Sequence, residues 1–114
     1  MTANSRAAVL EGPEQMAIRE YPLPALSTDD ALLRIEMVGV CGTDWKYFSG
    51  KLTVPYPIIL GHEILGRIAE IGERAADKYQ VKVGDRVLVE GSVPCWSCGR
   101  CRSGEYRFCE RRQG

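Results

Sequence analysis

Four of the five cysteines in this 114-residue chain fall within fifteen consecutive residues, at a spacing that suits a tetrahedral metal site. They are Cys95, Cys98, Cys101 and Cys109. Two thiolates of a Cys-x-x-Cys turn point at one ion, and two further thiolates complete a closed shell of the kind found in structural zinc sites. The spacing therefore predicts a structural zinc bound by the segment 91–112.

Dense cysteines also occur in disulfide frameworks, and the redox compartment distinguishes the two cases. Residues 1–6 contain no basic region followed by an apolar one, and no stretch of the chain is long or apolar enough to cross a bilayer. A cytoplasmic location is therefore expected, and a reducing cytoplasm favours metal over disulfides. Redox-active thiols and a rubredoxin-like iron site stay open as alternatives, although iron sites of that type normally combine two Cys-x-x-Cys turns from separate loops.

Basic side chains are concentrated around these cysteines. Zinc with four thiolates carries a formal charge of minus two, which nearby cations offset. The arginines of this segment outnumber its glutamates, and they are Arg100, Arg102, Arg107, Arg111 and Arg112. Charge compensation at the metal is one role for them, and an ordinary solvated basic face is the other.

A second group of possible ligands lies earlier in the chain. The fifth cysteine, Cys41, and the only histidine, His62, each follow an apolar segment at a break marked by glycine. Glu63 adjoins the histidine and Asp44 lies near the cysteine. A thiolate, an imidazole and carboxylates together suit an open, catalytic zinc. Taken singly, a buried thiol or a structural histidine is more common, and the sequence alone does not show whether these residues meet.

The composition indicates a single, mostly β domain. Fifteen basic residues balance fifteen acidic ones, so no global field would attract nucleic acid or an anionic membrane. Twelve glycines and six prolines are spread along the chain between short apolar segments rich in Val and Ile. Such a pattern is typical of short strands joined by many turns.

The first strands can be located from turns and alternation. Residues 6–10 and 15–20 are expected to form two strands joined by a hairpin turn at 11–14. The segment 31–37 alternates apolar and polar residues, so one of its faces should be buried. The apolar members of that face are Ala31, Leu33, Ile35 and Met37.

The candidate ligands lie beside the ends of such strands. Thr43 or Asp44 is expected to cap a short helix that follows the alternating strand. The segment 63–71 reads as extended but contains Gly66, which predicts a bulge or a barrel corner there. A further alternating strand at 86–90 leads into the cysteine segment.

In order along the chain, these motifs resemble the zinc-dependent medium-chain alcohol and polyol dehydrogenases. The matching stretches are Gly39-Val-Cys-Gly-Thr-Asp44, Gly61-His-Glu63 followed by Gly66 and Gly72, Val83-Gly-Asp-Arg-Val87, and the four-cysteine segment. The resemblance implies that 1–114 is the N-terminal part of the family's catalytic domain. This would be a GroES-like, partly open β-barrel with short helices and a zinc-binding loop at 91–112, incomplete at its C-terminal side. The nucleotide-binding domain would be absent from the chain.

The resemblance also implies a role for each candidate residue. Cys41 and His62 would be ligands of a catalytic zinc, and Glu63 would bind that metal directly or exchange with water. Thr43 would relay the alcohol proton, and Asp44 would hydrogen-bond the metal-bound imidazole. The structural zinc would be held by Cys95, Cys98, Cys101 and Cys109. Lys46 departs from the family, many members of which have a histidine there.

The reaction implied is hydride transfer from a small-molecule alcohol or polyol to a nicotinamide, with zinc as the Lewis acid. NAD(P) would be bound only by the full-length parent, because this chain contains no Gly-x-Gly-x-x-Gly fingerprint. The chain alone is therefore expected to be inactive. The sequence names neither the alcohol nor the choice between NAD and NADP.

A rival interpretation is a non-enzymatic zinc-binding interaction module, in which the cysteine segment and its arginines hold a partner or nucleic acid. Neutral net charge and the presence of Cys41, His62 and Glu63 argue against it. Neither nucleic acid nor membrane is expected as a partner. An incomplete barrel would leave a strand edge unpaired, and such an edge would allow self-association.

Overall fold

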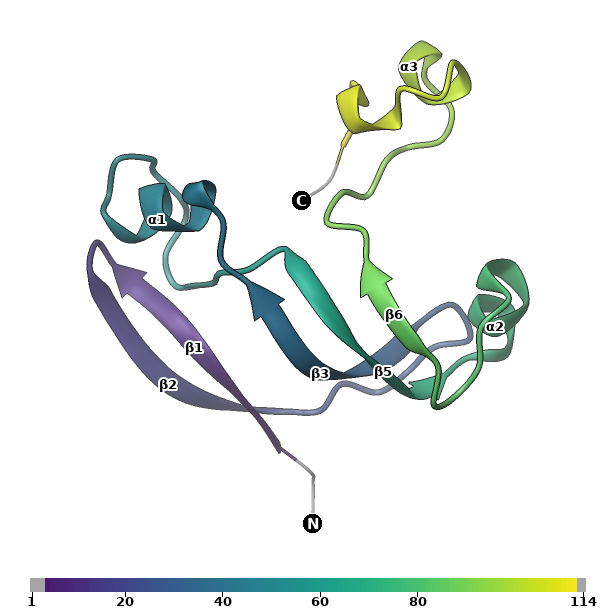
Figure 1. The fold of residues 1–114 in the computed structure, drawn as a ribbon, viewed down its shortest axis with the longest axis horizontal. Helices are drawn as coiled ribbons and strands as arrows, with labels where there is room; N and C mark the ends of the chain where they lie inside the picture. Colours follow the sequence, from purple (N-terminus) through teal and green to yellow (C-terminus); the bar gives the residue numbers. More distant parts are fainter. Residues whose placement is uncertain (1–3, 113–114) are drawn as a thin grey trace.

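The computed structural model describes residues 4–112 and is mostly β, as predicted (Figure 1). Its strands form two antiparallel three-stranded sheets. The first sheet has the order β2-β1-β4, with β1 at Asn4–Gly12, β2 at Gln15–Pro22 and β4 at Ile58–Ile59. The second has the order β3-β5-β6, with β3 at Ala31–Gly39, β5 at Glu63–Ile71 and β6 at Arg86–Val89.

The predicted hairpin is confirmed as β1 and β2. These strands pair from Asn4↔Pro22 to Gly12↔Gln15, with a register shift between Leu10 and Gly12 beside the turn. Pro22, the last residue of β2, and Pro24 just beyond it have no N–H to donate to a ladder, which explains why the strand ends here.

In the described part of the chain, four short helices connect and follow the strands. They are α1 at Gly42–Phe48, α2 at Glu73–Tyr79, α3 at Gly99–Arg102 and the 3-10 helix η1 at Tyr106–Phe108. Helix α2 was not predicted from the sequence. Within residues 4–112, none of the helices has the length and apolar character needed to cross a membrane.

The expectation that Thr43 or Asp44 is the N-cap residue of α1 is wrong, because the N-cap is Cys41; Asp44 takes part in the cap as the third helical residue of a capping box. The Cys41 Sγ accepts a hydrogen bond from the Thr43 N–H at 3.3 Å, and the Asp44 carboxylate accepts one from the Cys41 N–H at 3.0 Å. Together these bonds satisfy backbone donors that the first turn of a helix leaves without partners. The Cys41 thiol therefore caps the start of the helix, where a hydroxyl or a carboxylate was expected.

The buried apolar face expected for the segment 31–37 is also wrong, because Ala31, Ile35 and Met37 are exposed and Leu33 is only partly buried. Ile35 is 56% exposed and Met37 is 65% exposed. The pairing of β3 with β5 shifts register twice, between Leu32 and Leu33 and again between Ile35 and Met37. The first shift leaves an extra residue on β5, and the second leaves one, Glu36, on β3. The second shift changes the face on which the following β3 side chains lie, so the simple alternation does not persist along the strand.

A bulge is present where Gly66 predicted one, but its additional residue lies on the opposite strand, β3. Ile35 pairs with Gly66 and Met37 with Leu65, so Glu36 is the additional residue. A Cβ at Gly66 would lie only 2.5 Å from the Arg34 carbonyl oxygen. Gly66 is therefore required by the close approach of the two backbones.

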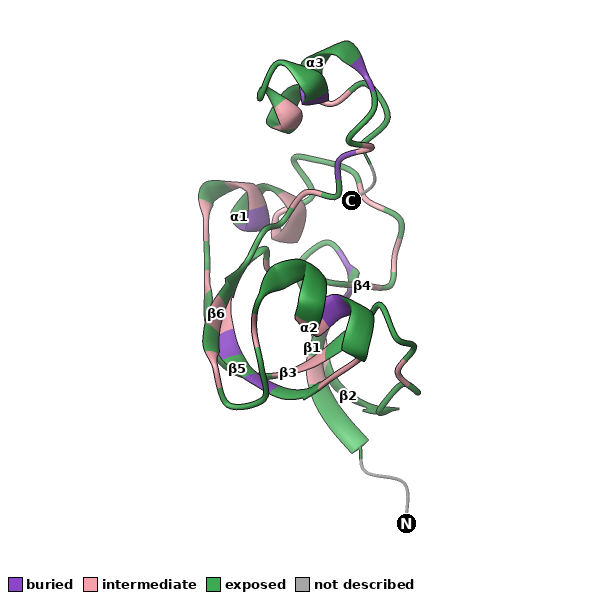
Figure 2. Cartoon of the chain, turned by 90° about the vertical axis from the view of Figure 1, so that its right-hand side faces the viewer, coloured by how far each residue is buried: buried purple, intermediate pink, exposed green. Residues whose placement is uncertain are grey.

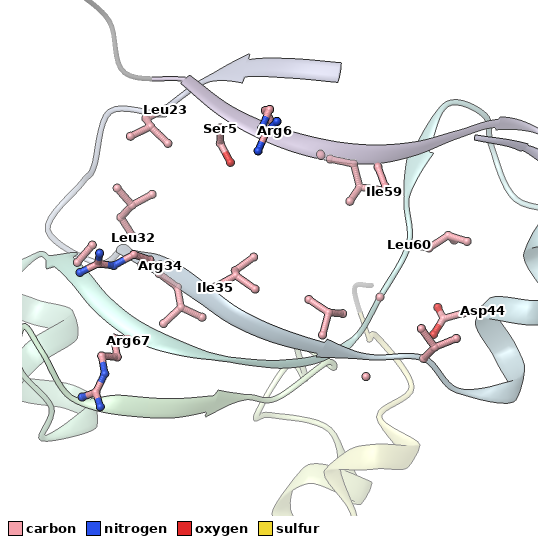
Figure 3. Close-up of a pocket in the computed structure, with 18 of the residues that line it drawn as sticks. Ser5, Arg6, Leu23, Leu32, Arg34, Ile35, Asp44, Ile59, Leu60 and Arg67 are labelled. Atoms are coloured by element: carbon pink, nitrogen blue, oxygen red, sulfur yellow. The ribbon is translucent and has the colours of Figure 1, made fainter. Parts of the chain in front are cut away.

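An apolar concavity of about 1270 Å³, open to solvent, lies between the two sheets. Figure 3 shows Leu23, Leu32, Ile35 and Ile59 pointing into the space between the hairpin and the second sheet. No element of residues 4–112 fills this space, which accounts for the exposure of Ile35.

The chain is consequently flat and has a small core (Figure 2). Its extents are 45 × 41 × 20 Å and its radius of gyration is 16.0 Å, against about 13 Å for a compact chain of this length. The buried apolar residues among those described are Val9, Leu10, Ile68, Ala75, Cys98 and Cys101. The cysteine segment, with α3, extends beyond β6 as a separate lobe (Figure 1).

Candidate metal centres

The four clustered cysteines converge on one point. Their Sγ atoms all lie within 4.8 Å of one another, with 3.9 Å from Cys95 to Cys101 and 4.0 Å from Cys98 to Cys109. These thiols are free, and the separations are far longer than the roughly 2.05 Å of a disulfide. Sulfur ligands of a tetrahedral zinc lie about 3.8 Å apart, so the donor set fits that metal.

Backbone N–H groups surround these sulfur atoms. The Cys95 Sγ accepts from the N–H of Ser97 at 3.4 Å and from that of Cys98 at 3.2 Å. The Cys109 Sγ accepts from the N–H of Cys95 and that of Arg111, both at 3.3 Å. Such donors favour the charged thiolate, which is the form that binds a metal.

The cysteines differ in how readily they ionise. Hydrogen bonds from Ser97, first its backbone N–H and then its hydroxyl, lower the pKa of Cys95 to about 5. The N–H of Cys101, followed by that of Glu110, lowers the pKa of Cys98. Burial raises the pKa of Cys101 to about 12. Hydrogen bonding and desolvation therefore act in opposite directions within one cluster.

Ser97 is a contributor that the sequence interpretation missed. Its hydroxyl lies 3.6 Å from the Cys95 Sγ and accepts a hydrogen bond from Arg111 Nη2 at 3.1 Å. The guanidinium of Arg111 thus reaches the cluster through Ser97, whereas that of Arg100 pairs with Glu105 at 2.9 Å. The sequence does contain a signal for this role, because Ser97 places a hydroxyl between the first two cysteines of the cluster.

The second group of candidate ligands also converges. The Cys41 Sγ lies 3.1 Å from His62 Nε2, and a carboxylate oxygen of Glu63 completes a trio whose ligand atoms lie within 4.8 Å of one another. A sulfur and a nitrogen on tetrahedral zinc are separated by roughly 3.5 Å, close to the distance found here. One thiol, one imidazole and one carboxylate fit a zinc site that keeps a fourth position open.

Strand pairing brings this trio together. Strands β3 and β5 pair antiparallel and their ladder ends at Gly39↔Glu63. Cys41 follows the end of β3 by two residues, and His62 immediately precedes the start of β5. The antiparallel ladder therefore places both residues at the same end of the sheet, beside α1.

Asp44 links the two sides of this site. It is buried, with 6% of its surface exposed, and its Oδ2 accepts the hydrogen bond from the Cys41 N–H. Its Oδ1 lies 3.6 Å from His62 Nδ1, on the side of the ring opposite the Cys41 sulfur. Thr43 contacts the Cys41 sulfur through its backbone N–H. The His62 side chain is 45% exposed, so the site is open to solvent.

Residues 27–114 match the family described as the alcohol dehydrogenase GroES-like domain. Among curated proteins, the chain is 47% identical over 106 residues to a probable alcohol dehydrogenase of Mycobacterium tuberculosis H37Rv, covering 93% of the chain and 29% of the relative. It is 39% identical over 110 residues to sorbitol dehydrogenase of Bacillus subtilis 168, covering 93% of the chain and 30% of that enzyme.

Solved structures of alcohol dehydrogenases are also similar to this chain. An alcohol dehydrogenase from Thermus sp. ATN1 superposes with a TM-score of 0.80 at 36% identity, covering 95% of this chain and 31% of that one. An alcohol dehydrogenase from E. coli CFT073, solved with NADH, gives a TM-score of 0.83 at 29% identity over 96% of this chain and 31% of that one. The chain spans about 30% of the length of these relatives.

The match to the family covers most of the chain and agrees with the open, mostly β architecture. It confirms both the fold class and the resemblance read from the glycine, histidine and cysteine motifs. The chain belongs to the family of zinc-type alcohol and polyol dehydrogenases that share the alcohol dehydrogenase GroES-like domain.

Proposed function

We propose that residues 1–114 form the GroES-like N-terminal domain of a zinc-dependent, NAD(P)-linked alcohol or polyol dehydrogenase. The observation that carries the proposal is the convergence of Cys41, His62 and Glu63 within 4.8 Å, at the end of the β3–β5 ladder. Names of relatives, which include alcohol and sorbitol dehydrogenases, support a small alcohol or polyol as the substrate of the whole protein.

In this proposal Cys41 and His62 hold the catalytic zinc, and Glu63 is its third protein ligand or exchanges with water. When bound, zinc supplies Lewis-acid polarisation of the alcohol oxygen, and the nicotinamide accepts the hydride. The 45% exposure of the His62 side chain leaves the trio accessible to a substrate.

The neighbouring residues have positioning and proton-transfer roles. Asp44 is buried and close to His62 Nδ1, so its carboxylate keeps the ring oriented with Nε2 toward the Cys41 sulfur. The Thr43 hydroxyl is proposed to accept the alcohol proton and pass it toward solvent. Asp44 also anchors the start of α1, which fixes the backbone of Cys41 relative to the histidine.

The four-cysteine cluster is proposed to be a structural zinc site. Four sulfur donors complete a tetrahedron and leave no position for a substrate. The lobe that contains α3 and η1 has little apolar core apart from Cys98 and Cys101, so metal binding would supply much of its folding free energy.

NAD(P) is proposed as a cofactor of the whole enzyme. A related alcohol dehydrogenase was solved with NADH, whereas every strand pair described here is antiparallel. Dinucleotides bind at parallel βαβ units, so we expect the 114-residue chain to show no NAD(P)-dependent alcohol oxidation by itself. Steady turnover by the pure chain would contradict this part of the proposal.

Zinc content per chain, measured by elemental analysis before and after mild chelation, tests the metal assignments. We expect two zinc ions, one retained by the four cysteines and one lost readily from Cys41, His62 and Glu63. One tightly held zinc would mean that the trio does not bind metal in this chain. Iron or disulfides in place of zinc would overturn the assignment of the cysteine cluster.

A further inference from the structure

The last residue pair of the β3–β5 ladder is Gly39↔Glu63, and the Glu63 side chain occupies the space beside Gly39. A Cβ atom built on Gly39 would lie 2.3 Å from Glu63 Oε2, 3.0 Å from its Cβ and 3.3 Å from its Cδ. Heavy atoms in real side chains do not approach to 2.3 Å. Any side chain at position 39 would therefore displace the Glu63 carboxylate.

The backbone at Gly39 does not itself require glycine. Among the described residues the glycines with positive φ are Gly50, Gly61, Gly84 and Gly104, and Gly39 is not one of them. Within a strand, alanine is ordinarily more stabilising than glycine because glycine loses more conformational freedom on folding. Glycine is therefore needed at position 39 because it leaves space for the Glu63 side chain.

The severe contact is with the carboxylate itself. Its oxygen Oε2 is the atom nearest to the added Cβ, at 2.3 Å, so the side chain would relieve the contact by turning the carboxylate out of the space beside Gly39. The carboxylate oxygen of Glu63 is one of three ligand atoms lying within 4.8 Å of one another. Moving it would leave Cys41 and His62 as a two-ligand site.

We infer that Gly39 is a positioning residue for the metal trio: its missing side chain leaves the volume in which the Glu63 carboxylate lies beside Cys41 and His62. The inference rests on the proposed function, because it treats the trio as a metal site. It adds a requirement that the candidate ligands themselves do not reveal, because Gly39 has no side chain that could bind a metal.

Cobalt(II) titration of the 114-residue chain tests this inference. Tetrahedral cobalt with thiolate ligands absorbs in the visible and near-ultraviolet, and a Cys41→Ser variant supplies the spectrum of the four-cysteine site alone. Gly39→Ala should weaken cobalt binding at the trio by about tenfold or more, the range typical for lost support of a metal ligand. Cobalt binding at the four-cysteine site should be unchanged.

Gly42→Ala is the matched control. Gly42 is next to Cys41, but a Cβ there would meet nothing within 4 Å. This variant should alter cobalt affinity at the trio by less than about twofold. An equal loss in both alanine variants would overturn the inference, as would unchanged affinity in Gly39→Ala.

A double-mutant cycle separates positioning from general damage to the fold. In a Glu63→Ala background, Gly39→Ala should cause no further loss of cobalt affinity, because the carboxylate it displaces is already gone. A further loss there, or loss of the four-cysteine spectrum in Gly39→Ala, would overturn the inference. If the unmodified chain binds no cobalt at the trio, the proposed metal site fails first and the inference fails with it.

Discussion

The Cys41 Sγ lies 3.1 Å from His62 Nε2, although 21 positions separate the two residues in the sequence. The antiparallel pairing of β3 with β5 brings them together, and the buried Asp44 contacts both: it accepts from the Cys41 N–H and lies 3.6 Å from His62 Nδ1. A site built in this way is open and depends on strand register. The four-cysteine cluster is instead local and closed.

The two sites should therefore differ in what they contribute to folding. Cys98→Ser removes a buried thiol of the proposed structural zinc site, so we expect the segment 91–112 to unfold and zinc retention after chelation to be lost. Cys41→Ser should leave the far-ultraviolet circular dichroism and the thermal midpoint nearly unchanged, because serine can still cap α1. Equal loss of structure in both variants would contradict this difference.

Replacement of Asp44 should weaken metal binding at Cys41, His62 and Glu63 more than it lowers the stability of the fold. In Asp44→Asn the amide oxygen can still accept from the Cys41 N–H, but the charge near His62 is lost. We expect metal affinity at the trio to fall by about 10-fold to 100-fold, with little change in unfolding free energy. Asp44→Ala should in addition destabilise the chain by about 1 kcal/mol, because the cap bond is lost. Isothermal titration and urea unfolding measure the two effects. Unchanged metal affinity in Asp44→Asn would exclude a role for the charge.

Acid should weaken the second sheet through Glu36. Its carboxylate lies 2.8 Å from Arg86 Nε and 3.1 Å from Arg67 Nε, and the hydrogen bond from Arg86 is the main cause of its lowered pKa. Because the folded-state pKa is below the ordinary value of 4.5, the ion pairs stabilise the fold fully above that pH. The stabilisation is lost as the pH falls through the lower, folded-state pKa.

Urea midpoints measured between about pH 6 and pH 3 check this pH dependence. Glu36→Gln should be less stable than the unmodified chain near neutral pH and should lose less stability on acidification. Because the carboxylate is near the surface, the effect should also diminish at high salt. Parallel pH curves for the two proteins would show that Glu36 does not contribute to the acid sensitivity.

The open sheets should also promote self-association, with a second copy of the chain as the partner. Strands β2 and β6 each have one neighbour in their sheet, and Leu88 on β6 is 78% exposed. Unpaired edges recruit other strands, and a lysine on the edge opposes this. Light scattering should show mass increasing with concentration, and Leu88→Lys should reduce the increase. Tyr79→Lys, at a 62% exposed site on α2, is the control and should leave association unchanged. A monomer at high concentration would refute the prediction.

The sequence alone was sufficient where the relevant interactions are local. The hairpin of β1 and β2 follows from a turn between two strands, and the Cys95 to Cys109 cluster follows from close spacing, because short segments restrict where their side chains can lie. The ordered motifs were also enough to identify the family. Helix α2 and the Cys41 cap were missed or misassigned, because propensities at helix ends are weak relative to the surrounding contacts.

Tertiary structure decided the features that depend on pairing between distant segments. The proximity of Cys41 and His62 is set by the register of β3 against β5. That register cannot be read from the alternation of apolar and polar residues in either strand. Ile35 is exposed where simple alternation predicted burial, because it lines the open concavity between the two sheets and no described element covers it. The space that Gly39 leaves for Glu63 appears only when the two strands are paired, because it belongs to the contact between them and to neither strand alone.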